Sequence, residues 1–300
     1  MSITYNKTET KTQEIFMRNY IISTETTCDL PMQVLNENNI YTINMKYSVN
    51  NVEYGTDKEM TNKEFCDAMR GGANTMTSSV NVYDAKAYFE DLLKEGKDIL
   101  HICFSSGMSG SCQNIKDVAE ELNKTSENKI YVVDSLCACS GQGLLVLLAC
   151  QKAETTDIKA LKEYLDEIRY HVCHFFTVDD LKYLVRGGRV SKTKAQIATL
   201  LNIKPVLYVD DEGRIIQYKN VISRKKSVAS LCDDLMKRFS GESDLILISH
   251  ADCLEDAIYL QNLIKQKTGY DSQICELGHV ICSHSGPGTL ALFFLGNKRF

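Results

Sequence analysis

The sequence predicts an α/β protein of two domains, on three observations. The chain has 300 residues, and at roughly 150 residues per domain this length suggests two domains. Short apolar runs alternate with helical patterns in the first half, which is typical of βαβ units and a mainly parallel sheet. A predicted β-hairpin then marks a change to an α+β arrangement. We expect a flexible extension over 1–18, an N-terminal α/β domain over 19–165 and a C-terminal α+β domain over 166–300, with exchange of segments between the domains left open.

The elements of the first half are recognised by length and spacing. The clearest helix covers 157–170, where Asp157 is a suitable cap and Ile158, Leu161 and Leu165 follow at helical spacing. Because helices separate the strands, we expect neighbouring strands to run parallel. The expected strands are 20–22, 41–47, 99–104 and 130–133, and the other expected helices are 61–70, 84–94, 114–122 and 141–151.

The second half combines helices and strands in a different order. The apolar runs 204–209 and 214–218 flank the segment Asp210-Asp-Glu-Gly213, which predicts a β-hairpin with a glycine in its turn. A helical stretch over 179–185 precedes the hairpin. The elements expected after it are a helix over 226–239, a strand over 245–248, a helix over 254–267 and a strand-like run from Gln273.

Composition and charge exclude several classes of protein. Apolar residues make up 44% and charged residues 24%, which are ordinary values for a globular protein. Lys and Arg number 34 against 39 Asp and Glu, so the net charge of −5 gives no overall basic footprint for nucleic acid. No window approaches the ~18 apolar residues of a membrane span, and the first 18 residues lack the apolar core of a secretory signal. We expect a cytoplasmic protein that binds no nucleic acid.

The twelve cysteines are expected to be buried thiols. Cys103, Cys173 and Cys282, among others, lie in apolar runs, as small buried side chains do. Cys137-Ala-Cys139 is the closest pair in the sequence, and no second pair follows at zinc-finger distance. We therefore expect no metal site and no cofactor.

The strongest local feature is the segment Ser105-Ser-Gly-Met-Ser-Gly-Ser111, between an apolar strand and a helix. At the carboxyl end of a strand, its hydroxyls and the N–H groups of the helix would suit an anionic head group. A helix cap with additional serines is the simpler alternative. The segment lacks the final glycine of a G-x-S-x-G nucleophile elbow, and the chain contains no P-loop motif for nucleotide phosphates.

Three further clusters are weaker candidates for a site. Thr75-Met-Thr-Ser-Ser79 precedes a predicted helix, as caps and loops commonly do. His284 lies before the tight turn Gly286-Pro-Gly288 and has either a structural or a functional role. Arg186-Gly-Gly-Arg-Val-Ser191 is a basic turn that a helix C-terminus alone would explain.

These clusters occur in an order that resembles the DegV family of bacterial fatty-acid-binding proteins. Each motif is modest, but seven in the same order are specific, and together they cover the chain from about Tyr20 to Phe294. The matching stretches are Thr24-Glu-Thr-Thr-Cys-Asp-Leu-Pro31, Thr77-Ser78, Ser105-Ser-Gly-Met-Ser-Gly-Ser111, Val133-Asp-Ser135, Leu181-Lys-Tyr-Leu-Val-Arg-Gly-Gly-Arg-Val-Ser191, Ile203-Lys-Pro205 and His284-Ser-Gly-Pro-Gly288.

The resemblance implies a DegV-like fold that encloses one long-chain fatty acid between its two domains. The implied ligand-binding residues are Thr77 and Ser109, which hold the carboxylate, together with Ser78, Gly110 and His284 beside them. Arg186 and Arg189 are implied contacts for a separate fatty acid kinase subunit, which supplies ATP and converts the bound acid to an acyl phosphate. The chain itself would be a carrier with no catalytic residue, and a transient contact with a membrane is left open.

The sequence departs from the family pattern at three places. Thr77-Ser-Ser-Val80 stands where the family has T-S-Q-P, Glu25 replaces an Asp, and Ile222 replaces an Arg. From the residue types we expect two neutral hydroxyls around the carboxylate and no Arg salt bridge, which would leave the carboxylate oxygen nucleophilic.

The alternatives use the same loop for other chemistry. A sugar-phosphate-binding or isomerase-type α/β enzyme would place a phosphate on the loop over 105–111, but it needs a general base nearby. The candidates, His101 and His284, are distant in sequence. A serine hydrolase is disfavoured by the incomplete elbow motif.

Overall fold

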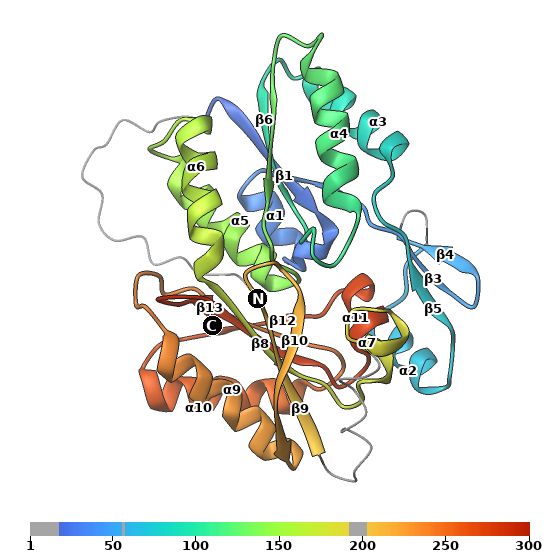
Figure 1. Ribbon diagram of the computed structural model, residues 1–300, viewed down its shortest axis with the longest axis vertical. Helices are drawn as coiled ribbons and strands as arrows, with labels where there is room; N and C mark the ends of the chain where they lie inside the picture. The colour runs from blue at the N-terminus through green and yellow to red at the C-terminus, as the bar shows by residue number, and fades with distance from the viewer. Residues whose placement is uncertain (1–17, 56–57, 192–202) are drawn as a thin grey trace.

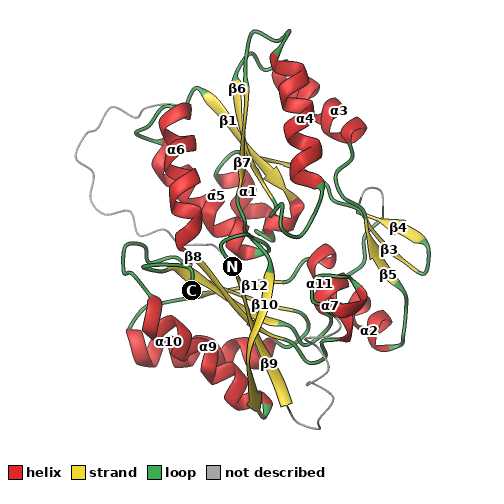
Figure 2. Cartoon of the chain, viewed as in Figure 1, coloured by secondary structure: helices red, strands yellow, loops and turns green. Residues whose placement is uncertain are grey.

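The computed structural model describes residues 18–55, 58–191 and 203–300, which form three β-sheets with helices around them (Figures 1 and 2). The extension predicted over 1–18 lies, apart from Arg18, outside the described residues. No helix in the described part of the chain is long and apolar enough to cross a membrane. All twelve cysteines lie within the described ranges and carry free thiols.

The first sheet is parallel, as the alternation of strands and helices predicts. Its strand order is β2-β1-β6-β7, and every neighbouring pair runs parallel. Both faces are covered, which explains why the strands are continuous apolar runs. The strands are β1 (Tyr20–Glu25), β2 (Ile40–Ile43), β6 (Asp98–Cys103) and β7 (Ile130–Asp134).

Alternate residues of these strands pack on opposite helical layers. Ile21 and Ile99 join the core cluster of α3 (Val82–Leu93) and α4 (Ser111–Asn123). Ile22 and Leu100 face the other way, toward α5 (Ser140–Ala153) and α6 (Ile158–Ile168). The short helix α1 (Met32–Glu37), which the sequence analysis missed, also contributes to this second cluster.

The second sheet has six strands in the order β10-β9-β8-β13-β11-β12, and its pairs are antiparallel except β11 with β12. The predicted hairpin is confirmed as β9 and β10. Helices α9 (Arg224–Arg238) and α10 (Leu254–Thr268) cover one face. The strands are β8 (Val172–Thr177), β9 (Ile203–Val209), β10 (Ile215–Ile222), β11 (Ile246–His250), β12 (Gln273–Glu276) and β13 (Leu290–Leu295).

Helix α5 lies between the two large sheets and joins them (Figure 1). It contacts β6 of the parallel sheet and β8, β11 and β13 of the mixed sheet. Nearly all of its side chains are buried, as expected for a helix that is apolar on every side. The single-turn helix η1 (Thr26–Cys28) follows β1, and the single-turn helix η2 (Arg169–His171) precedes β8. The domain boundary near residue 165 stays a prediction.

A small third sheet was not predicted. The run 41–47 was expected to be one strand, but β2 ends at Ile43, and the chain then leaves the parallel sheet. It pairs again as β3 (Tyr47–Val49), which lies antiparallel between β4 (Val52–Tyr54) and β5 (Thr75–Thr77). Helix α2 (Asn62–Arg70) connects β4 to β5 and begins with a complete capping box.

The strand-like run predicted from Gln273 is correct only for β12. The residues after Gly278 form helix α11 (His279–Ser285), which ends at the turn containing Gly286. Val280, Ile281 and Cys282 favour a strand by local propensity, but contacts with α2, α7 (Lys182–Arg186) and β5 stabilise the helix instead. This helix carries His284 toward the third sheet.

Candidate ligand-binding site

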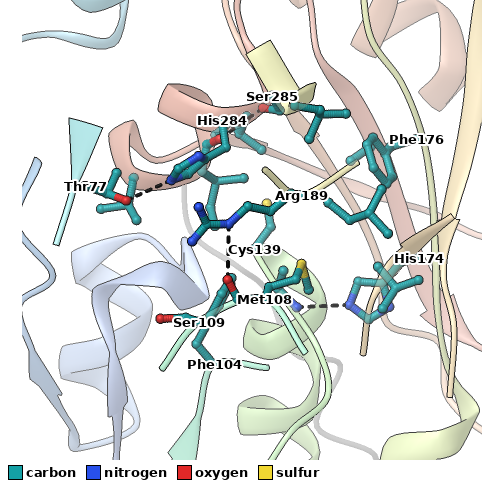
Figure 3. A pocket seen from close by; sticks show the side chains of 18 of the residues that line it. Thr77, Phe104, Met108, Ser109, Cys139, His174, Phe176, Arg189, His284 and Ser285 are labelled. Atoms are coloured by element: carbon teal, nitrogen blue, oxygen red, sulfur yellow. Dashed lines mark hydrogen bonds between the residues drawn. The ribbon is translucent and has the colours of Figure 1, made fainter. Parts of the chain in front are cut away.

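An apolar cavity of about 290 Å³ lies where the three sheets and α11 meet (Figure 3). Its wall includes residues that directly follow β6, at the carboxyl end of the parallel sheet, which is the usual ligand position in such folds. Most of the wall is apolar, and Thr77, Ser109 and His284 lie on one side of the cavity (Figure 3). Apolar lining residues include Met45, Phe104, Met108, Phe176, Val209 and Phe293, and the polar ones include Thr77, Ser79, Ser109, Arg189 and His284.

Thr77 and His284 meet at the polar side of the cavity. The hydroxyl oxygen Oγ1 of Thr77 lies 2.8 Å from Nε2 of His284, within hydrogen-bond distance. Thr77 ends β5 and His284 lies in the last turn of α11, so two elements far apart in sequence form this contact. The structure thus brings together two of the residues that the resemblance implied.

The imidazole of His284 is neutral at physiological pH. Burial, together with the positive charges of Arg189 and Arg186, lowers the pKa of His284 to about 4. Its Nδ1 atom has no hydrogen-bond partner among the described residues. Gly187 packs against the ring so closely that a Cβ at this position would lie 2.3 Å from Nδ1. His284 is therefore an uncharged hydrogen-bonding group held in place by α7.

The loop over 105–111 contributes Ser109 and Gly110 to the same cavity. Oγ of Ser109 accepts a hydrogen bond from the N–H of Ser111 at 3.2 Å, and the two hydroxyl oxygens are 3.0 Å apart. The Ser111 hydroxyl oxygen in turn accepts a bond from the N–H of Val80 at 3.0 Å. This contact ties the loop to the segment after Thr77, which places both hydroxyl clusters beside one cavity.

Two of the predicted residues lie differently from what the sequence suggested. Ser78 is exposed and is not part of the cavity wall, whereas its neighbour Ser79 is. Arg189 lies on the cavity wall, with its Nε donating to the carbonyl oxygen of Met108 at 3.1 Å. The Gly187-Gly188 turn folds Arg189 back onto the loop over 105–111, so an arginine lies beside the two hydroxyl clusters. The expectation that no Arg salt bridge reaches the carboxylate stays a prediction.

Arg186 lies at the edge of this region. Its side chain is exposed, and its Nη2 donates to the Thr75 hydroxyl at 2.8 Å. Arg186 and Arg189 therefore differ in position: one arginine faces solvent beside β5, and the other faces the cavity.

His174, which the sequence analysis missed, lies on the opposite side of the cavity from Thr77 (Figure 3). Its Nε2 accepts a hydrogen bond from the N–H of Ala138 at 3.2 Å, and its Nδ1 lies 3.1 Å from the carbonyl oxygen of Val172. Burial, and secondarily the charge of Arg299, lowers the pKa of His174 to about 3. With both nitrogens bonded to the backbone, His174 is a neutral residue of the cavity wall. The signal that could have revealed it in the sequence is a histidine within an apolar strand.

The fold and the cavity have the features of a binding protein for a small molecule with an apolar body and a polar head. The chain belongs to the DegV family, whose sequence profile, described as that of an uncharacterised protein family, matches residues 20–297. A DegV domain-containing protein of Clostridium perfringens is 39% identical, over 94% of this chain and 99% of that protein. A relative from Lactococcus lactis is 31% identical, over 92% and 98%.

Solved structures of the family have the same fold. A DegV family protein from Thermus thermophilus, described by its fatty acid binding, is 26% identical with a TM-score of 0.82, over 93% of this chain and 99% of that one. A fatty-acid-binding DegV family protein from Streptococcus agalactiae is 28% identical with a TM-score of 0.82, over 93% and 99%. DegV of Bacillus subtilis, a fatty-acid-binding protein, is 25% identical with a TM-score of 0.80, over 93% and 100%.

Proposed function

We propose that this chain binds one long-chain fatty acid in the cavity and presents its carboxylate to a separate ATP-dependent kinase subunit. The observation that carries the proposal is the division of the cavity into an apolar body and one polar side formed by Thr77, Ser109 and His284. Fatty acid binding by the related proteins of Thermus thermophilus and Streptococcus agalactiae supports the class of ligand.

The acyl chain supplies most of the binding energy. Each CH₂ group transferred from water to an apolar wall contributes about 0.8 kcal/mol. Phe104, Phe176 and Phe293 line the part of the cavity that would hold the chain. The neutral state of His174 fits this role, since a charged imidazole there would oppose burial of an alkyl chain.

The head group is oriented by hydroxyl donors and balanced by Arg189. Thr77 and Ser109 each have a hydroxyl at the polar side of the cavity, and a hydrogen bond to a carboxylate is worth about 1.5–3 kcal/mol. The guanidinium of Arg189 is the positive charge on the same wall. Arg186, exposed beside it, is the proposed contact for the kinase subunit.

In the proposed reaction, a carboxylate oxygen attacks the γ-phosphorus of ATP held by the partner, ADP leaves, and an acyl phosphate remains on the carrier. Such a transfer depends mainly on positioning and on electrostatic stabilisation of the phosphoryl oxygens. His284 and Arg189 line the same cavity as Thr77 and Ser109, which supports a role for both in meeting the incoming phosphoryl group. The lack of a P-loop motif in the sequence is consistent with a nucleotide supplied by the partner.

The sugar-phosphate alternative fits the cavity less well. A sugar phosphate needs many polar partners, whereas most of the wall is apolar. The Ser105 hydroxyl, one of the expected phosphate donors, instead donates to the carbonyl oxygen of Gly213 at 2.8 Å.

Native mass spectrometry of the purified chain tests the proposal. We expect a co-purifying mass of one long-chain fatty acid per chain, and the chain alone should neither hydrolyse ATP nor form acyl phosphate. A chain that carries no lipid, takes up none when long-chain fatty acids are added and binds sugar phosphates would contradict the proposal.

A further inference from the structure

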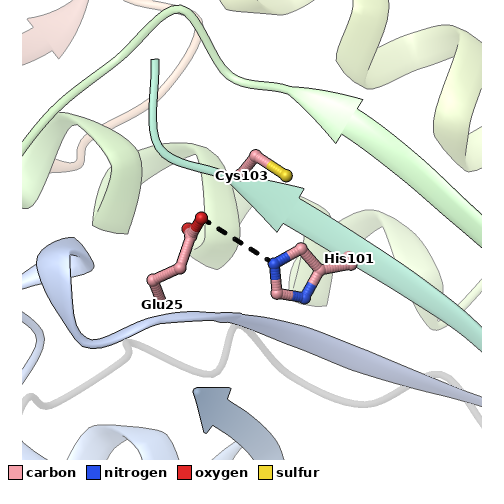
Figure 4. A group of neighbouring side chains, drawn as sticks. All are labelled: Glu25, His101 and Cys103. Atoms are coloured by element: carbon pink, nitrogen blue, oxygen red, sulfur yellow. Dashed lines mark ion pairs between the residues drawn. The ribbon is translucent and has the colours of Figure 1, made fainter. Parts of the chain in front are cut away.

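Three side chains with metal-binding atoms gather in the core of the parallel sheet, outside the cavity (Figure 4). Glu25 ends β1, and His101 and Cys103 lie on β6, which pairs with β1 in a register that matches Ser23 with His101 and Thr24 with Ile102. Ligand atoms of the three residues all lie within 4.8 Å of one another, and all three side chains are buried. The cluster therefore faces the interior between the sheet and helices α3 and α4.

Two atoms of this cluster are buried without a partner. Nε2 of His101 and Oε1 of Glu25 face each other at 3.9 Å, which is too long for a hydrogen bond, and neither has another partner in the described part of the chain. Leaving buried polar atoms unpaired is costly, so native structures usually satisfy them with a protein group, a water or an ion.

The other polar atoms of the same side chains are already occupied. Nδ1 of His101 lies 2.8 Å from the hydroxyl of Ser23. Oε2 of Glu25 accepts hydrogen bonds from the N–H of Phe104 and from Nε2 of Gln142, both at 2.7 Å. These contacts fix the orientation of the imidazole and the carboxylate, as outer hydrogen bonds do around metal sites. They leave the two unpaired atoms facing each other within the cluster.

We propose that Glu25, His101 and Cys103 bind a zinc ion. Nitrogen, sulfur and carboxylate oxygen are the donors that Zn²⁺ uses, whereas Mg²⁺ and Ca²⁺ require oxygen donors. When the ion binds, the Cys103 thiol loses its proton to solvent. The thiolate and the Glu25 carboxylate then balance the two positive charges, so the buried group is neutral overall. A water molecule completes the four ligands that zinc prefers.

The site would be structural and would act on the ligand cavity only indirectly. Cys103 is followed directly by Phe104, a cavity residue, and then by the loop over 105–111. An ion shared by β1 and β6 would hold the two strand ends together where this loop begins. Nothing in the proposed phosphoryl transfer requires it.

Metal analysis of the full-length chain tests the proposal. We expect about one zinc per chain after expression with added Zn²⁺ and dialysis against a weak chelator, and a loss of this zinc in Cys103→Ala and in Glu25→Gln. Cys232→Ala is the matched control, because Cys232 is also completely buried but lies in α9 and away from the cluster. A wild-type chain without zinc, or a Cys103→Ala chain that keeps it, would overturn the proposal.

A second measurement on the wild-type chain avoids the risk that variants of a buried cluster misfold. Expression with Co²⁺ in place of Zn²⁺ should give a thiolate-to-cobalt charge-transfer band and the visible bands of a tetrahedral ion. Absence of both bands in a folded chain would mean that no ion is bound by the Cys103 thiolate, and the zinc site would be rejected.

Discussion

At the scale of single residues, the polar side of the cavity depends on how two hydroxyl groups divide their hydrogen bonds. A hydroxyl donates one bond and accepts two. When Nε2 of His284 carries the ring proton, it donates to Thr77, and the Thr77 hydroxyl is then free to donate to a ligand. Ser109 accepts from the N–H of Ser111, and when the Ser111 hydroxyl also donates to it, the Ser109 hydroxyl likewise keeps its proton for a ligand. The same side can therefore hold a carboxylate without any movement of the backbone.

The double substitution Thr77→Val with Ser109→Ala should weaken fatty acid binding tenfold or more, because each lost hydrogen bond to a charged acceptor is worth about 1.5–3 kcal/mol. A fluorescence displacement titration measures the change. Ser78→Ala is the matched control, since this exposed hydroxyl lies outside the cavity wall and its loss should leave the affinity unchanged. Equal affinities for the double variant and wild type would remove these residues from the site.

His284→Ala should leave folding nearly intact and keep most of the affinity for the acyl chain. It should nevertheless reduce acyl phosphate formation with the cognate kinase by at least ~10²-fold, as expected for a lost positioned group. The measurement is a coupled assay at saturating fatty acid, with thermal unfolding of the variant as a control. Turnover within a few-fold of wild type would assign His284 a purely structural role.

At the scale of elements, the site depends on contacts between α7 and α11. The turn after α7 places Gly187 against the ring of His284 and Arg189 on the cavity wall. The motifs that contain Arg189 and His284 can be found in the sequence, because a glycine pair and a Gly-Pro-Gly turn are local signals, as the hydroxyl clusters are. Sequence reasoning missed α11, since Val280 and Ile281 suggest a strand. It gave Arg189 as a contact for the kinase subunit and did not identify it as a cavity residue, since a turn's direction depends on packing with distant residues.

Gly187→Ala tests this contact. The new Cβ would lie 2.3 Å from Nδ1 of His284, and such overpacking costs about 1–3 kcal/mol of unfolding free energy. Gly71→Ala is the matched control, because Gly71 also follows a helix in a right-handed helical conformation, with φ −70° against −72° for Gly187. A Cβ at Gly71 would lie 3.3 Å from its nearest neighbour, the carbonyl oxygen of Ala68, so this variant should lose less stability than Gly187→Ala. Denaturant unfolding that shows equal stability for the two variants would contradict the contact.

At the scale of the whole molecule, parallel strands and the hairpin follow from sequence patterns, but the joining of the two large sheets does not. Burial on every side of α5 is visible in its apolar sequence, yet its partners β8, β11 and β13 come from the other half of the chain. The same long-range packing disfavours the charged form of several histidines. Burial lowers the pKa values of His174, His250, His279 and His284.

Stability should therefore decrease on acidification. A histidine with a lowered folded pKa binds its proton first in the unfolded chain, so unfolding free energy is lost as pH falls from about 6.5 toward 4. Asp29 opposes this trend, because burial raises its pKa to about 7 and the folded chain protonates it first. For completely buried His174 the slope reaches about 1.4 kcal/mol per pH unit. Denaturant unfolding at several pH values should show a shallower slope for His174→Gln than for wild type, whereas identical slopes would contradict the burial of a neutral imidazole.

A crystal structure with a long-chain fatty acid that carries bromine on its terminal carbon would show in which direction the ligand lies in the cavity. We predict anomalous scattering from bromine inside the cavity, on the side of His174 and Phe176, and a carboxylate within hydrogen-bond distance of the Thr77 and Ser109 hydroxyls. Bromine beside Thr77, or a fatty acid bound outside the cavity, would rule out the proposed binding mode.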